Sequence, residues 1–254
     1  MLEAADIGIT RRQGDRPTVF QHLMDGTFGL LHGYRFLVQS SGVSVAFRRF
    51  KETAQDVFHL GGGVIADLGA HVFDLIHALL GDYDSLFAVS RIAYPQRPSA
   101  ADPTRLEKVE AEDCVKIIAG MQNGAIGTIE ATKTATGTED ELRFELHGST
   151  GAIRFNSMQP HQLGIYEAGL SDQPLGGMKG WTAVDCGQRY PETQFPGPKF
   201  SIGWMRAHVA CLFNFLSHVS RGVPAEPAFE QGLYVQQIIE RVRESVKRRE
   251  WVRV

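Results

Sequence analysis

The sequence predicts an α+β fold, in which a mostly antiparallel open sheet carries helices packed on one face. Residues 64–80 repeat apolar side chains at helical spacing, whereas residues 85–167 mostly alternate apolar and polar side chains with the period of a strand. Within that second stretch, Gln122-Asn123-Gly124 separates two alternating runs, and Asn-Gly is a strong hairpin signal. Consecutive hairpins make neighbouring strands antiparallel.

The elements are expected as one domain over residues 18–254, preceded by an arm over residues 1–17. Strands are expected at residues 30–40, 43–47, 85–93, 113–119, 125–134, 143–148, 153–155, 162–167, 182–185 and 251–254. Helices are expected at residues 18–24, 64–80, 202–219 and 229–249, and the third is expected to be covered on two sides. Residues 94–105 and most of 169–200 are rich in proline or glycine and are expected as loops.

The helix that follows Gly61-Gly62-Gly63 is where chemistry is expected. One of its stripes is apolar and suits a buried face, and it comprises Ile65, Leu68, Val72, Leu75, Ile76 and Leu79. Asp67, His71 and Asp74 form a second stripe, because spacings of four and three place side chains on one helix face. A buried helix carries few charges, so this row of acid, imidazole and acid predicts a functional site.

Composition and charge exclude several classes of protein. The chain has 254 residues, of which 43% are hydrophobic and 22% charged, as in ordinary globular domains. Its net charge of −3 argues against binding to nucleic acid or to an anionic membrane. The sequence has no run of 18 apolar residues, so a membrane-spanning helix is not expected. Three cysteines at long spacings and a polar amino-terminal segment predict reduced thiols in a cytoplasmic protein.

Several short motifs, taken in order, resemble the Gfo/Idh/MocA family of glucose–fructose oxidoreductase and inositol dehydrogenase relatives. The central one is the triple glycine followed by Asp67-x-Gly69-x-His71-x-x-Asp74 and Leu79-Leu80-Gly81. The others are Asp25-Gly26-Thr27-Phe28-Gly29, the hairpin at residues 146–153, Phe229-Glu230-Gln231-Gly232 and the ending at residues 245–252. The resemblance covers residues 18–254 and implies the carboxy-terminal α+β domain of such an enzyme.

The resemblance implies a site that binds a sugar or polyol. It gives Asp67 and His71 the roles of contacting substrate hydroxyls and of proton transfer, which suits an imidazole because it titrates near neutral pH. Trp204, His208 and Lys133 are further candidates for substrate binding, although a core tryptophan and a solvated lysine are the plainer interpretations. The family resemblance also implies a homo-oligomer that forms through the open sheet face.

Neither a metal site nor nucleophilic catalysis by cysteine is expected. Asp67, His71 and His77 could supply metal ligands by residue type, but helical spacing turns His77 away from Asp67. No histidine pattern accompanies the cysteines, which argues against a cysteine nucleophile.

The sequence departs from the family in two places. It contains no Gly-x-Gly-x-x-Gly turn after a strand and no Glu-Lys-Pro, whose lysine takes part in catalysis in the family. We therefore expect no cofactor to bind this chain alone, and NAD or NADP to bind if a dinucleotide-binding domain is present. Four hypotheses follow: part of an NAD(P)-dependent oxidoreductase, a subunit completed by a separate Rossmann partner, a non-redox lyase, epimerase or hydrolase, and a catalytically silent binding protein.

Overall fold

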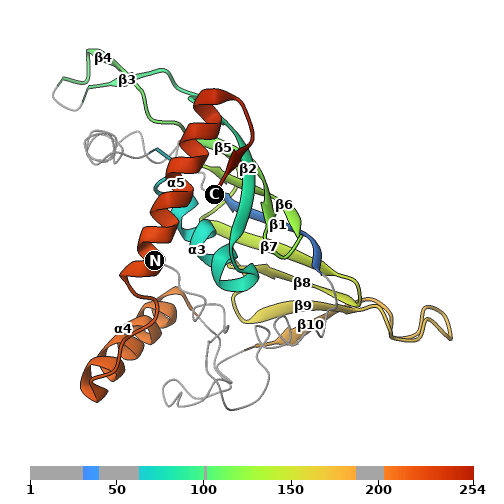
Figure 1. Ribbon diagram of the computed structural model, residues 1–254. Helices are drawn as coiled ribbons and strands as arrows, with labels where there is room; N and C mark the ends of the chain where they lie inside the picture. Colours follow the sequence, from blue (N-terminus) through green and yellow to red (C-terminus); the bar gives the residue numbers. More distant parts are fainter. Residues whose placement is uncertain (1–30, 40–62, 100–101, 187–202) are drawn as a thin grey trace.

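Nine strands form one sheet whose order along its width is β10-β9-β8-β7-β1-β6-β5-β2-β11 (Figure 1). The computed structural model describes residues 31–39, 63–99, 102–186 and 203–254. The strands of this sheet are β1 (Leu31–Gln39), β2 (Tyr83–Arg91), β5 (Cys114–Met121), β6 (Ile126–Thr132), β7 (Glu141–Gly148), β8 (Gly151–Asn156), β9 (Gln162–Glu167), β10 (Trp181–Asp185) and β11 (Val252–Arg253). Two short strands, β3 (Gln96–Pro98) and β4 (Leu106–Lys108), pair separately.

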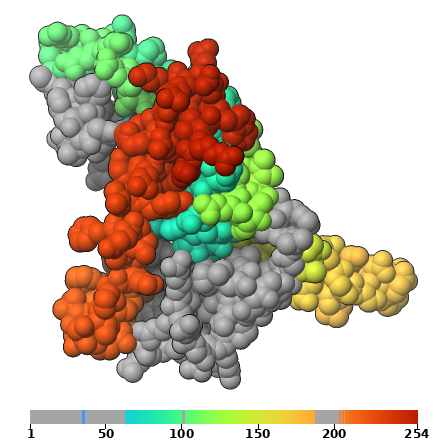
Figure 2. All heavy atoms as spheres, viewed as in Figure 1, coloured from blue at the N-terminus to red at the C-terminus, as the bar shows by residue number. Residues whose placement is uncertain are grey.

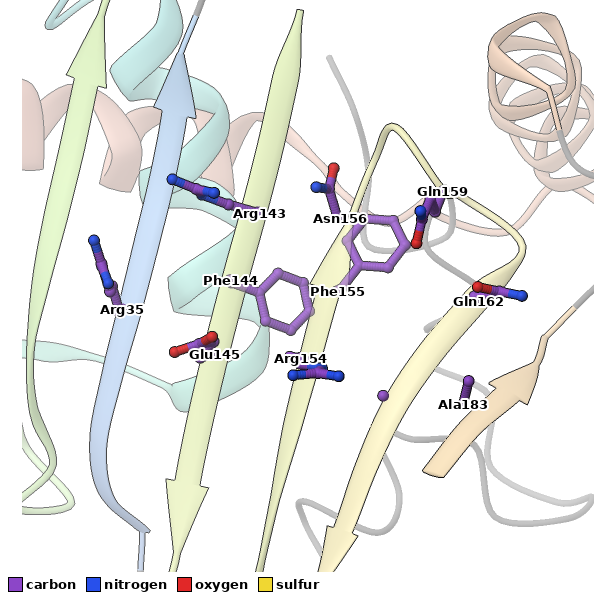
Figure 3. A pocket seen from close by; sticks show the side chains of 11 residues that line it. Arg35, Arg143, Phe144, Glu145, Arg154, Phe155, Asn156, Gln159, Gln162 and Ala183 are labelled. Carbon is purple, nitrogen blue, oxygen red and sulfur yellow. The ribbon is translucent and has the colours of Figure 1, made fainter. Parts of the chain in front are cut away.

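The described part of the chain contains the helices α3 (Leu68–Leu80), α4 (Trp204–Arg221) and α5 (Phe229–Arg248). Helix α5 packs against β2 and α3, and α3 packs against β1 and β6. In Figure 3 the open face of the sheet is towards the viewer, and both helices lie behind the sheet. The predicted fold class, an antiparallel open sheet with helices on one face, is confirmed.

One strand pair in this mostly antiparallel sheet is parallel. Strand β1 lies between β6 and β7, and it runs parallel to β6 and antiparallel to β7. Parallel neighbours need a long crossover between them, and the crossover from β1 to β6 includes α3, β2 and β5. At the centre of this arrangement Phe36 is paired with both Ile129 and Phe144, and the rings of Phe36 and Phe144 stack at 5.0 Å.

The core lies between the sheet and the helices α3 and α5. The apolar stripe of α3 is buried as predicted, with Val72 and Ile76 fully inaccessible to solvent. Strands β5 and β7 alternate as predicted, so that Val115, Phe144 and other inward side chains meet that stripe. The buried face of α5 completes the core with Val235, Ile238, Ile239 and Val242.

Three sequence predictions are wrong. Residues 94–105 contain β3, which pairs with β4, because the buried carboxylate of Asp113 binds Arg97 of β3 and anchors it. The apolar stripe of α4 is exposed, since this helix packs extensively against no other element in the described ranges. Leu233 of α5 is also 62% exposed, contrary to its predicted inward position. The elements expected at residues 1–17, 18–24 and 43–47 lie outside the described residues.

The outline of the molecule is uneven. The loop between β9 and β10 projects far from the body, and α4 extends from the opposite side (Figures 1 and 2). Three cysteines, Cys114, Cys186 and Cys211, carry free thiols. Within the ranges that the structure describes, no helix has both the length and the apolar character needed to cross a bilayer.

Replacing Ser245 is expected to test how α5 is joined to the sheet. The fully buried Ser245 hydroxyl accepts the Ala88 N–H at 2.9 Å and donates to the Glu250 carbonyl at 2.6 Å. Ser245→Ala leaves both backbone groups unsatisfied and should lower the free energy of unfolding by about 1–3 kcal/mol, as measured by urea denaturation. Ser220→Ala on exposed α4 is the control and should change it by less than about 0.5 kcal/mol. Equal effects of the two variants would contradict this role.

Candidate functional site

The site begins at the turn that precedes α3. Residues 64–67 form this turn, and the Ala66 and Asp67 amides both donate to the Gly63 carbonyl. Asp67 occupies the N-cap position of α3, where aspartate normally accepts a hydrogen bond from the first helical turn. Its side chain makes no such bond and is 45% exposed. The Asp67 carboxylate is therefore available to another partner.

That partner is Lys133. The Lys133 ammonium forms an ion pair with the Asp67 carboxylate, although the two residues lie 66 positions apart in the sequence. Lys133 directly follows β6, and only 18% of its side chain is exposed. A pair with this exposure is weakly stabilising, because solvent screens it and two long side chains must be ordered. Its value is geometric, since it fixes a donor and an acceptor side by side.

His71 lies one turn further along α3 and is half-buried. Burial lowers the pKa of His71 below its usual value, while the negative charge of Asp67 acts in the opposite direction. The imidazole is therefore neutral at pH 7, and a neutral imidazole can accept a proton. Asp67, His71 and Lys133 together provide an acceptor of hydroxyl hydrogen bonds, a proton acceptor and a cation.

Sequence reasoning missed three residues that support this cluster. Glu112 contacts the turn before α3, and Asp113 contacts the backbone of Lys133. The only sequence signal was an acidic pair directly before a buried strand, which is also typical of a solvated turn. Thr132 is a third such residue, since its buried hydroxyl accepts the Thr134 N–H at 3.1 Å and shapes the chain around Lys133.

Of the remaining predicted residues, His208 is not brought to this cluster. His208 is exposed on α4, and α4 packs extensively against none of the elements that carry the cluster in the described ranges. Trp204 begins α4, and its side chain lies outside the described residues. Substrate binding by these two residues stays a prediction.

His77 turns away from Asp67, as its helical spacing predicted. Its Nε2 atom lies 3.1 Å from the Asp82 carboxylate, and its ring packs 4.3 Å from that of Tyr234. Among the described residues, no group of three or more histidine, cysteine and acidic side chains is arranged to hold a metal ion.

A separate pocket of about 380 Å³ lies on the open face of the sheet (Figure 3). Its lining is mixed: Phe144 and Phe155 contribute apolar surface, and the polar side chains include Arg35, Arg143, Glu145, Arg154, Asn156 and Gln162. Arg154 is held flat against the sheet, because its guanidinium lies 4.4 Å from the Trp181 ring centre and its stem covers Gly164. This pocket is on the sheet face opposite α3.

Glu112 covers the glycine turn that precedes α3. In dinucleotide folds the pyrophosphate accepts hydrogen bonds from free amides at a helix start beside glycines. Here the Val64 and Ile65 N–H groups donate to Glu112, and a Cβ atom at Gly63 would lie 2.3 Å from the Glu112 carboxyl carbon. The two amides beside Gly63 are therefore occupied by groups of the protein itself.

A family model described as "Oxidoreductase family, C-terminal alpha/beta domain" matches residues 37–254. The chain belongs to the Gfo/Idh/MocA oxidoreductase family. Levoglucosan dehydrogenase of Pseudarthrobacter phenanthrenivorans is 30% identical over 207 residues, which cover 76% of this chain and 52% of that protein. D-apiose dehydrogenase of Rhizobium rhizogenes is 30% identical over 96 residues, which cover 37% of this chain and 24% of that protein.

Solved structures agree with the family assignment. Levoglucosan dehydrogenase in complex with NADH and levoglucosan superposes with a TM-score of 0.84 at 25% identity, covering 99% of this chain and 64% of that one. An NAD binding oxidoreductase from Klebsiella pneumoniae has the same fold, with a TM-score of 0.78 at 21% identity, and covers 92% of this chain and 61% of that one. The chain therefore spans about half the length of the levoglucosan dehydrogenase sequence and less than two thirds of each of these two solved chains.

The lowered pKa of His71 predicts a specific pH dependence. The unfolded chain binds a proton at His71 near pH 6.5, whereas the folded protein binds it only at lower pH. The unfolded state therefore holds more protons in this window, and the contribution of His71 destabilises the fold at acid pH and is relieved as the pH rises above about 6.5.

NMR titration of the imidazole should place the His71 midpoint below about 6.5, with the signal assigned by its absence in His71→Gln. Asp67→Asn should lower the midpoint further, because it removes the negative charge that raises the pKa of His71. A midpoint that stays the same or rises in Asp67→Asn would show that the two side chains do not interact.

Proposed function

We propose that the chain is the substrate-binding and oligomerisation portion of an NAD(P)-dependent sugar or polyol oxidoreductase. The observation that carries this proposal is the convergence of Asp67, His71 and Lys133 at the start of α3. Membership of the family and the levoglucosan bound in one solved relative support a carbohydrate substrate.

Each side chain has a role that follows from its chemistry. The Asp67 carboxylate accepts a hydrogen bond from one substrate hydroxyl, and the Lys133 ammonium donates to a neighbouring oxygen. His71 accepts the proton of the hydroxyl that is oxidised, which its neutral state at pH 7 allows. Asp67 also stabilises the imidazolium that results, because its negative charge lies nearby.

Oxidation of an alcohol also requires a hydride acceptor. In this proposal the acceptor is NAD or NADP, bound by a dinucleotide-binding domain that belongs to a longer form of the protein or to a separate partner. The contacts of Glu112 support this arrangement, because the Val64 and Ile65 amides beside Gly63 are already hydrogen-bonded and are not offered to a pyrophosphate. Proton transfer and substrate orientation are then the contribution of this chain.

The proposal predicts binding of a sugar without a dinucleotide. Levoglucosan should bind the protein in a saturation-transfer NMR titration, and Asp67→Ala or His71→Ala should weaken it about 10–100-fold, since each removes a hydrogen bond to a charged or proton-accepting group. Asp84→Asn is the matched control and should have no effect, because Asp84 pairs with exposed Arg253 on the surface.

Three further results would overturn parts of the proposal. Saturable binding of NADH to the chain alone, measured by its fluorescence, would show that a dinucleotide site exists here. Consumption of a sugar without any dinucleotide would favour a lyase or epimerase that uses Asp67 and His71. Unchanged levoglucosan binding in both alanine variants would remove these residues from the site.

The open face of the sheet is proposed as the homo-oligomer interface. Arg35, Glu145 and Arg154 are cross-strand partners, so their charges alternate along one row. A second copy rotated about a twofold axis can place its Glu145 against these arginines, which makes the row complementary to itself. Aromatic and arginine side chains such as Trp181 and Arg154 are also enriched in protein interfaces.

Ile118 offers a test of this interface. It is 42% exposed on β5, in the row that continues through Thr128 to Arg35. Ile118→Asp buries a charge in the proposed interface and should convert the oligomer to a monomer in size-exclusion chromatography with light scattering. Leu233→Asp on α5 is the matched control, since Leu233 is 62% exposed on the helical side. Dissociation by the Leu233 variant alone would place the interface on the helices.

A further inference from the structure

Glu112 holds the turn that carries Asp67. Its backbone carbonyl accepts the Val64 N–H at 2.9 Å, and its carboxylate accepts the Ile65 N–H at 2.9 Å. The carboxylate also lies directly over Gly63, where any Cβ atom would come within 2.3–2.4 Å of it. Backbone and side chain of one residue therefore fix three successive residues of the turn.

Asp113 holds the segment that carries Lys133. Its carbonyl accepts the Lys133 N–H at 2.9 Å, and its own N–H donates to the Arg91 carbonyl at 2.9 Å. The carboxylate of Asp113 is buried and is bound by the Arg97 guanidinium and the Ala93 N–H. A carboxylate satisfied by several donors is firmly fixed, so Asp113 provides a rigid attachment for Lys133.

Glu112 and Asp113 are adjacent, and consecutive Cα atoms lie about 3.8 Å apart. The turn before α3 and the end of β6 are therefore attached to neighbouring points on one chain. Glu112 binds the amides of Val64 and Ile65, which precede α3, and so holds the chain that leads into the helix. The Asp67 carboxylate, at the N-cap position of α3, makes no capping bond and pairs with Lys133.

We propose that Glu112 and Asp113 are positioning residues that set the separation of the Asp67 carboxylate and the Lys133 ammonium. This inference rests on the proposed function only for its consequence, which is that the acidic pair fixes the spacing of substrate oxygens that the site accepts. The geometry of the ion pair itself exists without substrate, so it is measured without substrate.

The experiment follows the Lys133 ammonium by proton–nitrogen NMR in the protein without ligand. An ion-paired lysine exchanges its ammonium protons slowly enough to give a signal, which Lys133→Arg identifies by its absence. Glu112→Ala should abolish this signal, because the turn loses its carboxylate acceptor. Glu112→Gln should retain it, because the amide oxygen can still accept the Ile65 N–H. Gly63→Ala should abolish it too, since the new methyl group displaces the Glu112 carboxylate.

Two controls separate positioning from general destabilisation. Ile153→Val, in the core on β8, weakens the fold three strands away from β6 and should leave the signal intact. Glu110→Gln removes an exposed acid two residues from Glu112 and should also have no effect. A signal that persists in Glu112→Ala, or that Ile153→Val abolishes equally, would overturn the proposal.

The result stays informative if the proposed function fails. Loss of the signal in Glu112→Ala together with no levoglucosan binding in the wild-type protein would support positioning and reject the carbohydrate substrate. An intact signal in Glu112→Ala with weakened levoglucosan binding would overturn positioning, because Glu112 would then act on the ligand by another route.

Discussion

The burial of one stripe of α3 against the sheet determines the geometry on which the rest of the structure depends. Val72 and Ile76 are fully inaccessible to solvent, and rotation of the helix would expose them. Each buried aliphatic side chain contributes about 1.5–3 kcal/mol, so the rotational position of α3 is strongly determined. Asp67 and His71 follow from this position, since they lie beside the buried stripe, and Asp67 pairs there with Lys133 at the end of β6.

Three acidic residues at the site each bind a different partner. Glu112 satisfies the amides of the turn, Asp113 anchors the arginine of β3, and Asp67 pairs with Lys133. Each acid has a different partner, so no two carboxylates compete for one cation. His71 remains neutral although Asp67 lies close to it on the same helix. Burial lowers the pKa of His71 by more than the charge of Asp67 raises it.

The fold could be predicted where a pattern repeats within one element. The stripe of α3 and the alternation of β7 each contain enough residues to reveal their period. The turn between β5 and β6 is indicated by its Asn-Gly pair. The parallel pairing of β1 and β6 could not be predicted, because it joins segments about 90 residues apart and has no local pattern. The exposed stripe of α4 was also misjudged, since periodicity reports which face is apolar but not whether anything packs on it.

The candidate site shows the same division. Asp67 and His71 were found because they share a helix face, whereas their link to Lys133 depends on tertiary structure. Glu112 and Asp113 were missed because an acidic pair before a strand has no distinctive spacing. Spacing in the sequence identifies site residues that lie on one helix or strand. Residues that connect different helices and strands are recognised only in the three-dimensional structure.

The position of β1 has a consequence for how the chain assembles. Strands β6 and β7 are consecutive, yet they cannot pair with each other, because β1 lies between them. Both of its neighbours are far away in sequence, and pairing between distant segments slows folding. A sheet from which segment 31–39 is missing would leave β6 and β7 with open edges, and an open strand edge can pair with another chain.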